Sequence, residues 1–307
     1  MNKIAFLFLI NDMIINHDLW NTFFDDAINK CNVYVRSKKF DVHNIKLDTK
    51  YKIIKSDVKT MWGNSTLVVA EYEMLKYAYD DDINNDKFIL CSESCIPLLS
   101  FSEIMNTFVD GISYFDNTRE YKRNDMHSEN NREIVKVKQW FILDRNHVEY
   151  IINNFERNYE FLFTVSFPDE NYFSTILYQI FKNEIVFRPI TFDFFNSKIT
   201  PKYETFINNI VKNVKRGDLQ YSLRDISRSV NELNNSKQYV NLPSYFKHKI
   251  DRSVIELTQL IKGELSLNNF RKMNIYSPVS INRNDFTPLL KQYIIDKGYL
   301  FARKIIR

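Results

Sequence analysis

Seven consecutive apolar residues near the amino terminus, IAFLFLI at positions 4–10, constrain the fold of this chain most strongly. The run stops at Asn11 and Asp12. It is too short to cross a membrane, and no small-residue cleavage site of a signal peptide follows it. A strand that is apolar on both faces is typical of a parallel sheet covered by helices. We therefore expect a buried parallel strand in an α/β domain.

Short apolar runs and amphipathic stretches continue to alternate as far as about residue 195. Ser65 lies just before the first clear helical stretch and is expected to cap that helix. The further strands that we expect cover residues 33–36, 87–91, 112–115 and 186–191. The expected helices cover residues 67–78, 102–108, 146–155 and 173–180.

Three parts follow from this pattern. Residues 1–200 are expected to form an α/β core with a mostly parallel sheet. Residues 201–285 show no strand signal and are expected to be a helical addition packed on that core, and residues 286–307 form a C-terminal segment. The polar stretch 116–133 reads as a long loop that borders a site or is simply mobile.

The composition excludes several kinds of site. Five glycines in 307 residues leave no Gly-rich phosphate loop, so any bound phosphate must be held by side chains. The five histidines are scattered without ligand spacing, and no GxSxG elbow is present. The three cysteines are expected to be free thiols in a reducing compartment. The net charge of +4 is too small to indicate a nucleic acid partner.

Two carboxylates stand between a proline and an apolar helical run in FPDENYFSTIL, residues 167–177. Asp169 and Glu170 are suited to capping a helix, because an acidic side chain there accepts from unpaired backbone N–H groups and complements the helix dipole. The alternative is that one of them is a general base. The segment alone leaves both interpretations open.

Charged groups at two other places could bind a phosphate or a metal. The D-x-D pattern at 80–82 holds a divalent metal in many sugar-nucleotide enzymes, but it precedes the strand at 87–91 and is expected to be a solvated loop. That strand instead directs Ser92 and Glu93 to the carboxyl edge, where α/β sheets bind ligands. Arg303 and Lys304, in the terminal GYLFARKIIR, belong to a solvated tail or neutralise a phosphate as a metal would.

Eight segments, taken in order, resemble the core-2/I-branching enzyme family, glycosyltransferase family 14, which includes β-1,6-N-acetylglucosaminyltransferases and peptide O-xylosyltransferases. Together they span roughly residues 3–182 and 299–305. SESCIPL, QWFILDR, PDENYF and LFARK are the most specific pieces. The segments are KIAFLFLIND, LWNTFF, VYVRS, MWGNSTLVVAEYEMLKYA, FILCSESCIPLLSF, VKQWFILDRNHVEYI, SFPDENYFSTIL and LFARKI.

The resemblance implies a GT-A-like fold and a metal-independent, inverting transfer from a UDP-sugar to a hydroxyl of a glycan acceptor. N-acetylglucosamine is the first choice of sugar and xylose the second. The family's catalytic base falls on Glu170, which leaves Asp169 as the better helix cap. The family's pyrophosphate ligand falls on Lys304, with Arg303 beside it. The expected donor site is completed by Tyr34, Val35, Arg36, Ser92 and Glu93.

The acceptor side is less determined by the resemblance. Trp62, Arg119, Trp140 and Asp169 are candidate acceptor contacts. The further candidates are Glu71, Lys122 and Arg123 as rim residues, and Lys215 and Arg216 as a second phosphate ligand. The chain departs from the family at Arg36, where many members have His, and at residues 92–95, which read Ser-Glu-Ser-Cys instead of Ser-Gly-x-Asp. Without the anchor, stem and disulfides of animal members, it is expected to be cytoplasmic and bacterial or viral. A non-catalytic UDP- or carbohydrate-binding module is the alternative.

Overall fold

The computed structural model describes residues 2–38, 45–116, 134–193, 259 and 281–306. The chain divides into two compact units. The first consists of Met1–Phe192 and Ile295–Arg303, and the second of Asp193–Ile294 and Lys304–Arg307. Nearly all of the helical addition expected at 201–285 lies outside the described residues.

Seven strands form the main sheet of the first unit, in the order β3-β2-β1-β4-β7-β6-β8. Neighbouring strands are parallel except at β7, which runs antiparallel to β4 and to β6. The predicted α/β core with a mostly parallel sheet, as the GT-A-like resemblance implied, is confirmed. The strands are β1 (Lys3–Ile10), β2 (Cys31–Ser37), β3 (Tyr51–Ile53), β4 (Asn85–Ser92), β6 (Ser113–Asp116), β7 (Phe141–Asp144) and β8 (Ile185–Arg188).

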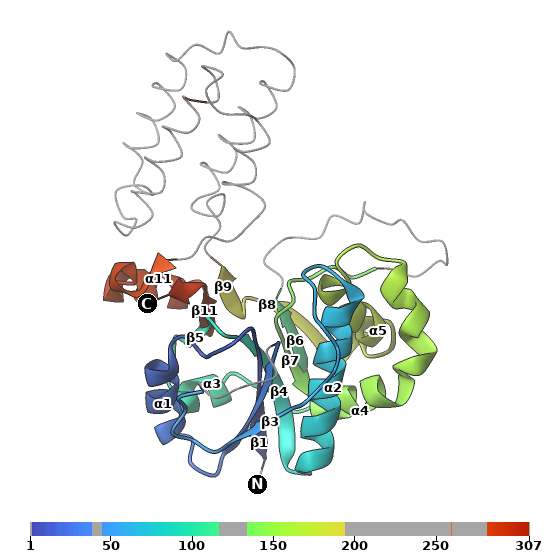
Figure 1. Ribbon diagram of the computed structural model, residues 1–307, viewed down its shortest axis with the longest axis horizontal. Helices are drawn as coiled ribbons and strands as arrows, with labels where there is room; N and C mark the ends of the chain where they lie inside the picture. The colour runs from blue at the N-terminus through green and yellow to red at the C-terminus, as the bar shows by residue number, and fades with distance from the viewer. Residues whose placement is uncertain (1, 39–44, 117–133, 194–258, 260–280, 307) are drawn as a thin grey trace. The chain divides into compact units, whose positions relative to one another are not determined.

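The N-terminal apolar run becomes β1, and its side chains alternate between two cores. Ala5 and Leu7 pack with α2, α4 and α5, whereas Phe6 and Phe8 pack with α1 and α3. Figure 1 shows these helices on opposite faces of the sheet. A strand covered on both faces must be apolar throughout, which explains the run. The helices are α1 (His17–Asp25), α2 (Ser65–Asp81), α3 (Phe101–Met105), α4 (Arg145–Asn154) and α5 (Tyr172–Ile180).

Two local expectations need correction. The side chain that caps α2 is Asn64, which accepts from the Thr66 N–H (3.1 Å), so Ser65 is the first helical residue instead of the cap. Strand β7 was not among the strands that we expected, because its four residues, directly before α4, are too few to show a strand period. Asp144 ends the strand and caps the helix by accepting from the Asn146 N–H (3.1 Å).

A small sheet joins residues 301–303, near the end of the chain, to the rest of the first unit. Its strands are β5 (Ile96–Pro97), β11 (Phe301–Arg303) and β9 (Thr191–Asp193), in that order. The Leu98 N–H donates to the Leu300 carbonyl (3.0 Å), and the Leu300 N–H donates to the Ile190 carbonyl (3.0 Å). Because β5 closely follows β4, this sheet places β11 near the carboxyl edge of the main sheet.

In the second unit, β10 (Ile281–Asn282) pairs in parallel with β12 (Ile305–Ile306). Helix α11 (Pro288–Ile295) follows the short 3-10 turn η6 (Arg283–Asp285) along the chain. The first unit also has three 3-10 segments, η1 (Glu156–Phe163), η2 (Pro168–Glu170) and η3 (Lys182–Glu184).

Two expectations about thiols and membranes can be compared with the structure. Cys31, Cys91 and Cys95 are free, as predicted, and burial raises the pKa of the Cys31 thiol to about 12. None of the helices in the described ranges has the length and apolar character that crossing a lipid bilayer demands.

We expect the buried ion pair between β4 and β7 to be a major source of stability. Lys87 Nζ lies 2.6 Å from Asp144 Oδ2, with both side chains 4% exposed, so Asp144→Ala leaves an uncompensated buried cation. The free energy of unfolding, measured in urea, should fall by about 3–5 kcal/mol. Asp80→Ala, which breaks the exposed Lys76–Asp80 pair, should cost less than about 1 kcal/mol. Equal losses would contradict the expectation.

Candidate active site

Ser92 and Glu93 lie at the carboxyl edge of the sheet, as expected. Glu93 Oε2 accepts from the Asn11 N–H (2.5 Å), and the Glu93 carbonyl accepts from the Ile15 N–H (2.9 Å). Ser92 Oγ is 3.2 Å from Cys95 Sγ. The loop after β4 therefore holds the loop after β1, at the edge where sheets of this kind bind ligands.

The side chains expected on the donor side from β2 are engaged within the protein. Arg36 is buried and donates to Ser56 Oγ (3.0 Å) and to the Val58 carbonyl (2.9 Å). The Tyr34 hydroxyl donates to Asp81 Oδ2 (2.7 Å), which lies at the end of α2. The Tyr34 hydroxyl and the Arg36 guanidinium are therefore occupied by contacts within the protein.

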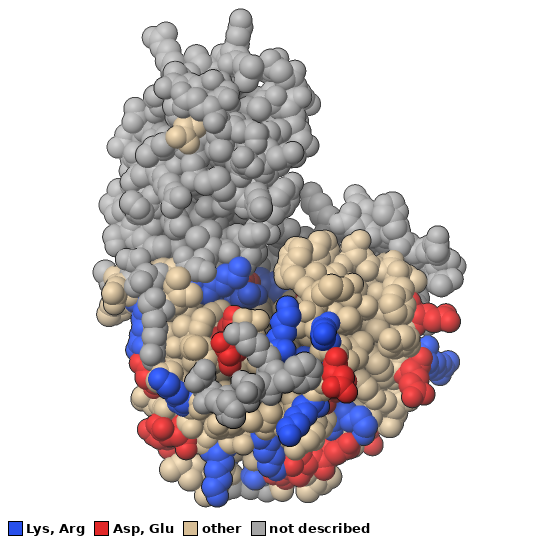
Figure 2. All heavy atoms as spheres, viewed as in Figure 1, with Lys and Arg blue, Asp and Glu red and all other residues tan. Residues whose placement is uncertain are grey.

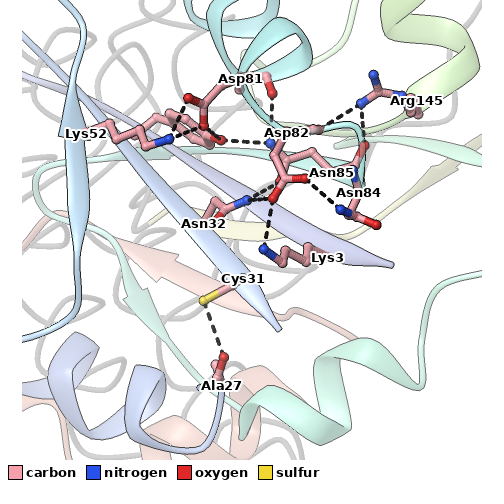
Figure 3. A network of polar contacts seen from close by, with 12 residues as sticks. Lys3, Ala27, Cys31, Asn32, Lys52, Asp81, Asp82, Asn84, Asn85 and Arg145 are labelled. Carbon is pink, nitrogen blue, oxygen red and sulfur yellow. Dashed lines mark hydrogen bonds and ion pairs between the residues drawn. The ribbon is translucent and has the colours of Figure 1, made fainter. Parts of the chain in front are cut away.

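The acidic run 80–82 belongs to a polar network at the opposite, amino edge of the sheet (Figure 3). Asp82 pairs with Lys3 (2.9 Å), and this ammonium group is the first reason that the pKa of Asp82 is held well below its ordinary value. Asp81 pairs with Lys52 (2.5 Å), and Asp80 with Lys76 (2.6 Å). Asp80 and Asp81 end α2, and Asp82 is its C-cap, so the run is not the solvated loop that we expected. Among the described residues, no group of three or more His, Cys, Asp or Glu side chains is placed to hold a metal.

Glu170 ends the 3-10 turn η2, which backbone and amide contacts hold in place. The Val137 N–H donates to the Glu170 carbonyl (2.8 Å), and the Glu170 N–H donates to the Phe167 carbonyl (2.9 Å). The Asn171 side chain donates to the carbonyls of Ser166 and Phe167, both at 2.9 Å. The position of Glu170 is therefore fixed by contacts that do not involve its carboxylate.

The Glu170 carboxylate remains accessible. Its side chain is 36% exposed, and its Oε2 atom lies 3.3 Å from Lys136 Nζ, whose side chain is 45% exposed. A pair this exposed is weak and can open when a ligand approaches. The carboxylate can therefore accept a proton or a hydrogen bond from a bound molecule.

Two exposed aromatic rings lie beside this turn. Trp62 is 82% exposed and Phe167 is 38% exposed, and their ring centroids are 5.4 Å apart in an edge-to-face arrangement. Phe167 has φ 55 and ψ 66, a strained conformation for a bulky residue. Gly63 permits the approach, because a Cβ there would lie 3.0 Å from the Phe167 ring. Exposed aromatic faces next to a carboxylate suit a sugar ring with free hydroxyl groups.

Asp169 does not cap α5, contrary to expectation. The residue at the helix start is Asn171, and no side chain caps that end. Burial, and then the neighbouring charge of Glu170, raises the pKa of Asp169 to about 6.

Glu71, on α2, is fully buried and accepts from Gln139 Nε2 (2.7 Å). Burial, and then Asp169, raises the pKa of Glu71 well above its ordinary value.

Residues 136–140, here called the linking segment, connect the Glu170 turn to strand β11. Lys136 and Val137 contact Glu170, and Gln139 contacts Glu71. Lys138 Nζ lies 3.1 Å from Asp116 Oδ1 and donates to the Thr191 carbonyl (2.8 Å). Trp140 is buried, and the Arg303 guanidinium lies 4.5 Å from the centroid of its ring. Arg303 is thereby oriented by an aromatic face.

The remaining expected residues fall elsewhere. Lys304 belongs to the second unit, has φ 62, and accepts from the Ile281 N–H through its carbonyl (2.9 Å). Arg119, Lys122, Arg123, Lys215 and Arg216 lie outside the described residues. Glu71, expected at the rim, is instead fully buried on α2. Sequence reasoning missed Lys136, Gln139, Phe167 and Asn171. For Phe167 and Asn171, the signal was their place on either side of the Pro-Asp-Glu turn.

Basic and acidic side chains are interspersed on the face of the molecule that Figure 2 shows. No single sign of charge dominates the described residues there.

Comparisons with known proteins give one family. The model of the core-2/I-branching enzymes matches residues 4–220. "Glycosyltransferase BC10" of rice, Oryza sativa subsp. japonica, is 26% identical over 168 residues, which are 50% of this chain and 41% of BC10. The chain thus spans about two fifths of the length of that relative.

Two solved structures are more distantly similar, and the second is described as the glycosyltransferase GlyE. An active-site mutant of LgtC is 10% identical, with a TM-score of 0.34, and the match covers 62% of this chain and 75% of LgtC. GlyE of Streptococcus pneumoniae TIGR4 is 11% identical, with a TM-score of 0.29, over 60% of this chain and 45% of GlyE.

Gly63→Ala should destabilise the turn for two separable reasons. A side chain at φ +67 is strained by about 1–2 kcal/mol, and the new methyl group would clash with the Phe167 ring. Gly111→Ala is the matched control, because Gly111 has φ +74 and nothing within 4 Å of the added Cβ. In urea unfolding, Gly63→Ala should cost more than Gly111→Ala, and Phe167→Ala should remove the excess. Equal costs in the two glycine variants would show that the ring contact is unimportant.

Proposed function

The chain belongs to the core-2/I-branching enzyme family of glycosyltransferases, and on this premise we propose that it is an inverting, metal-independent UDP-sugar transferase. The acceptor is a hydroxyl group of a glycan. N-acetylglucosamine is the first choice for the transferred sugar and xylose the second, as in the family. Glu170 is the general base. The observation that carries this proposal is the accessible carboxylate of Glu170 on a turn fixed by its backbone.

Inversion requires the acceptor oxygen to attack the anomeric carbon from the face opposite to UDP. Glu170 takes the proton from that hydroxyl as the new glycosidic bond forms and the bond to UDP breaks. Lys136 pairs with Glu170 only at the surface, so the approaching hydroxyl can replace it. The turn need not move, because its contacts with Val137 and Asn171 are made without the carboxylate.

The departing UDP needs compensation for its negative charge. We assign this role to Arg303 and Lys304, with no metal required. The contact of Arg303 with the Trp140 ring supports the assignment, since a stacked guanidinium keeps its N–H groups directed for a phosphate. Ser92 and Glu93 shape the donor side by holding the loops at the carboxyl edge, and the end of β2 meets the uridine.

Trp62 and Phe167 are proposed to contact the acceptor. Both rings are accessible and lie by the Glu170 turn, so a sugar bound against them would present its hydroxyl groups to the carboxylate. Trp140 is less suited to this role, because it is buried and Arg303 lies against its ring. Asp169 is mostly enclosed within the turn.

Two rival functions make different predictions. A non-catalytic module would bind UDP but would show neither transfer nor slow hydrolysis of a UDP-sugar. A metal-dependent transferase using Asp80 and Asp82 would lose activity in chelator and recover it with manganese. Asp82 is held by Lys3 at the amino edge of the sheet, away from the edge where sheets of this kind bind ligands, and this disfavours that mechanism. A thermal-shift screen of UDP-sugars would identify the preferred donor, because binding stabilises the folded state.

Glu170→Gln should abolish transfer while leaving UDP affinity nearly unchanged. Loss of a positioned base costs roughly 10²–10⁴-fold in rate, and the backbone contacts of the turn are retained. Transfer is measured as UDP release with acceptor present, in excess chelator, and UDP affinity by calorimetry. Glu149→Gln, at an exposed position on α4, is the matched control. Full activity of the Glu170 variant would remove this residue from the mechanism.

Lys304→Ala and Arg303→Lys should both weaken UDP binding. Removing one charged hydrogen-bond donor costs about 1.5–3 kcal/mol, so Kd should rise about tenfold or more for Lys304→Ala. Arg303→Lys retains the charge but loses the planar contact with Trp140. Uridine affinity should change little in either variant, since uridine has no phosphate. Lys291→Ala, exposed on α11, serves as the control, and an unchanged Kd for UDP would refute the assignment.

A further inference from the structure

Two carboxyl groups with buried oxygen atoms, one within the Glu170 turn and one on the helix that packs against it, are not used by the proposed mechanism. Glu71 lies on α2 and is fully buried, and Asp169 lies on η2, which packs against α2. Glu71 Oε2 and Asp169 Oδ1 are both buried side-chain atoms without a hydrogen-bond partner among the described residues. Buried polar oxygens are rarely left in this state, because the desolvation cost is not recovered.

The surroundings cannot compensate two negative charges. Gln139 donates one hydrogen bond to Glu71 Oε1, and the cation that acts on Asp169, Lys136, lies at the surface and pairs with Glu170. The strands under α2 contribute apolar residues to the core there. The charged side chains of the neighbouring α4 and η1 include Glu149, Glu156, Arg157 and Glu160, all exposed.

We propose that Glu71 and Asp169 share one proton, and that this acid pair positions the turn that carries Glu170. A protonated Glu71 has an O–H group to donate, and an ionised Asp169 has an oxygen to accept it. One proton therefore satisfies both unpartnered oxygens and removes one of two buried charges. The arrangement resembles other sites in which neighbouring carboxyl groups cannot both ionise.

The acid pair links the interior to the proposed base. Asp169 and Glu170 are adjacent in the turn, so a hydrogen bond that holds Asp169 against α2 also limits the movement of Glu170. The ionised form of Asp169 places a negative charge beside Glu170. Glu71 is thus a positioning residue that acts through Asp169. This second step rests on the proposed function of Glu170, whereas the shared proton does not.

The shared proton has a thermodynamic signature with a definite sign. The folded chain raises the pKa of Asp169 from 3.8 to about 6, and it raises the pKa of Glu71 well above its ordinary value. Through these two groups the folded state binds more protons than the unfolded state above about pH 4, while His147, whose pKa is lowered by burial, contributes with the opposite sign in every variant. Stability should fall as the pH rises through this window. Both raised pKa values act with the same sign, so each carboxyl group contributes to the fall.

The test uses the full chain and the variants Glu71→Gln, Asp169→Asn and the double variant, with Glu156→Gln as an exposed control. We expect the urea midpoint of the wild type to fall between about pH 5 and about pH 8. Each single variant should reduce that fall by about half or more, and the double variant should add little, because the two residues share one proton. Additive changes, or an unreduced fall in Glu71→Gln, would overturn the shared proton.

An infrared measurement provides a direct second reading. The carbonyl band of a protonated carboxylic acid should persist in the wild type at about pH 7.5 and disappear in Glu71→Gln. Its absence from the wild type would also refute the proposal. These two measurements require no substrate, so they decide on the shared proton even if no donor is transferred.

The positioning step is tested by the pH profile of transfer. Glu71→Gln, which retains a donor to Asp169, should keep most of the wild-type turnover and flatten its dependence on pH, while Glu71→Leu should lower turnover without changing UDP affinity. Equal turnover in the Leu and Gln variants would reject the positioning role. Absence of transfer in every protein, with the infrared band present, would instead reject the proposed function of Glu170.

Discussion

The antiparallel strand β7 is the constraint on which the site depends. Its neighbours β4 and β6 run in the opposite direction, so the segment that precedes β7 lies at the carboxyl edge, beside the loops that follow the parallel strands. Residues 136–140 therefore contact the Glu170 turn on one side and strand β11 on the other. In an all-parallel sheet the same residues would lie at the amino edge, where Asp81 and Asp82 form a structural network.

The contacts of the linking segment divide the tasks of a transfer site. Val137 and Gln139 contact the turn and α2, which carry the acidic groups. Lys138 and Trp140 contact β6, β9 and β11, and Trp140 orients Arg303. Arg303, from the far end of the chain, is thus connected to the proposed base Glu170 through one short segment, residues 136–140. The ring of Trp140 is buried and contacts the Arg303 guanidinium, so it is better placed to orient this cation than to bind an acceptor.

The sequence predicted what depends on long apolar patterns. Strand β1, the main helices, the free cysteines and the α/β core follow from periodicity and composition. It did not predict β7, because four residues beside a helix have no period of their own. Nor did it predict that Asp169 is not a cap, because the burial of that side chain depends on its packing against α2, far away in sequence. Local propensity favoured capping, and tertiary packing overrode it.

The distribution of three carboxylates explains why such packing is useful. A site that binds an anionic nucleotide must keep a basic carboxylate without accumulating negative charge. Glu170 is partly exposed and pairs with Lys136 at the surface, while burial favours the neutral form of Glu71. Asp169 lies between the two, and its pKa is raised to about 6. The three residues would thus separate the proposed base from the proposed shared proton.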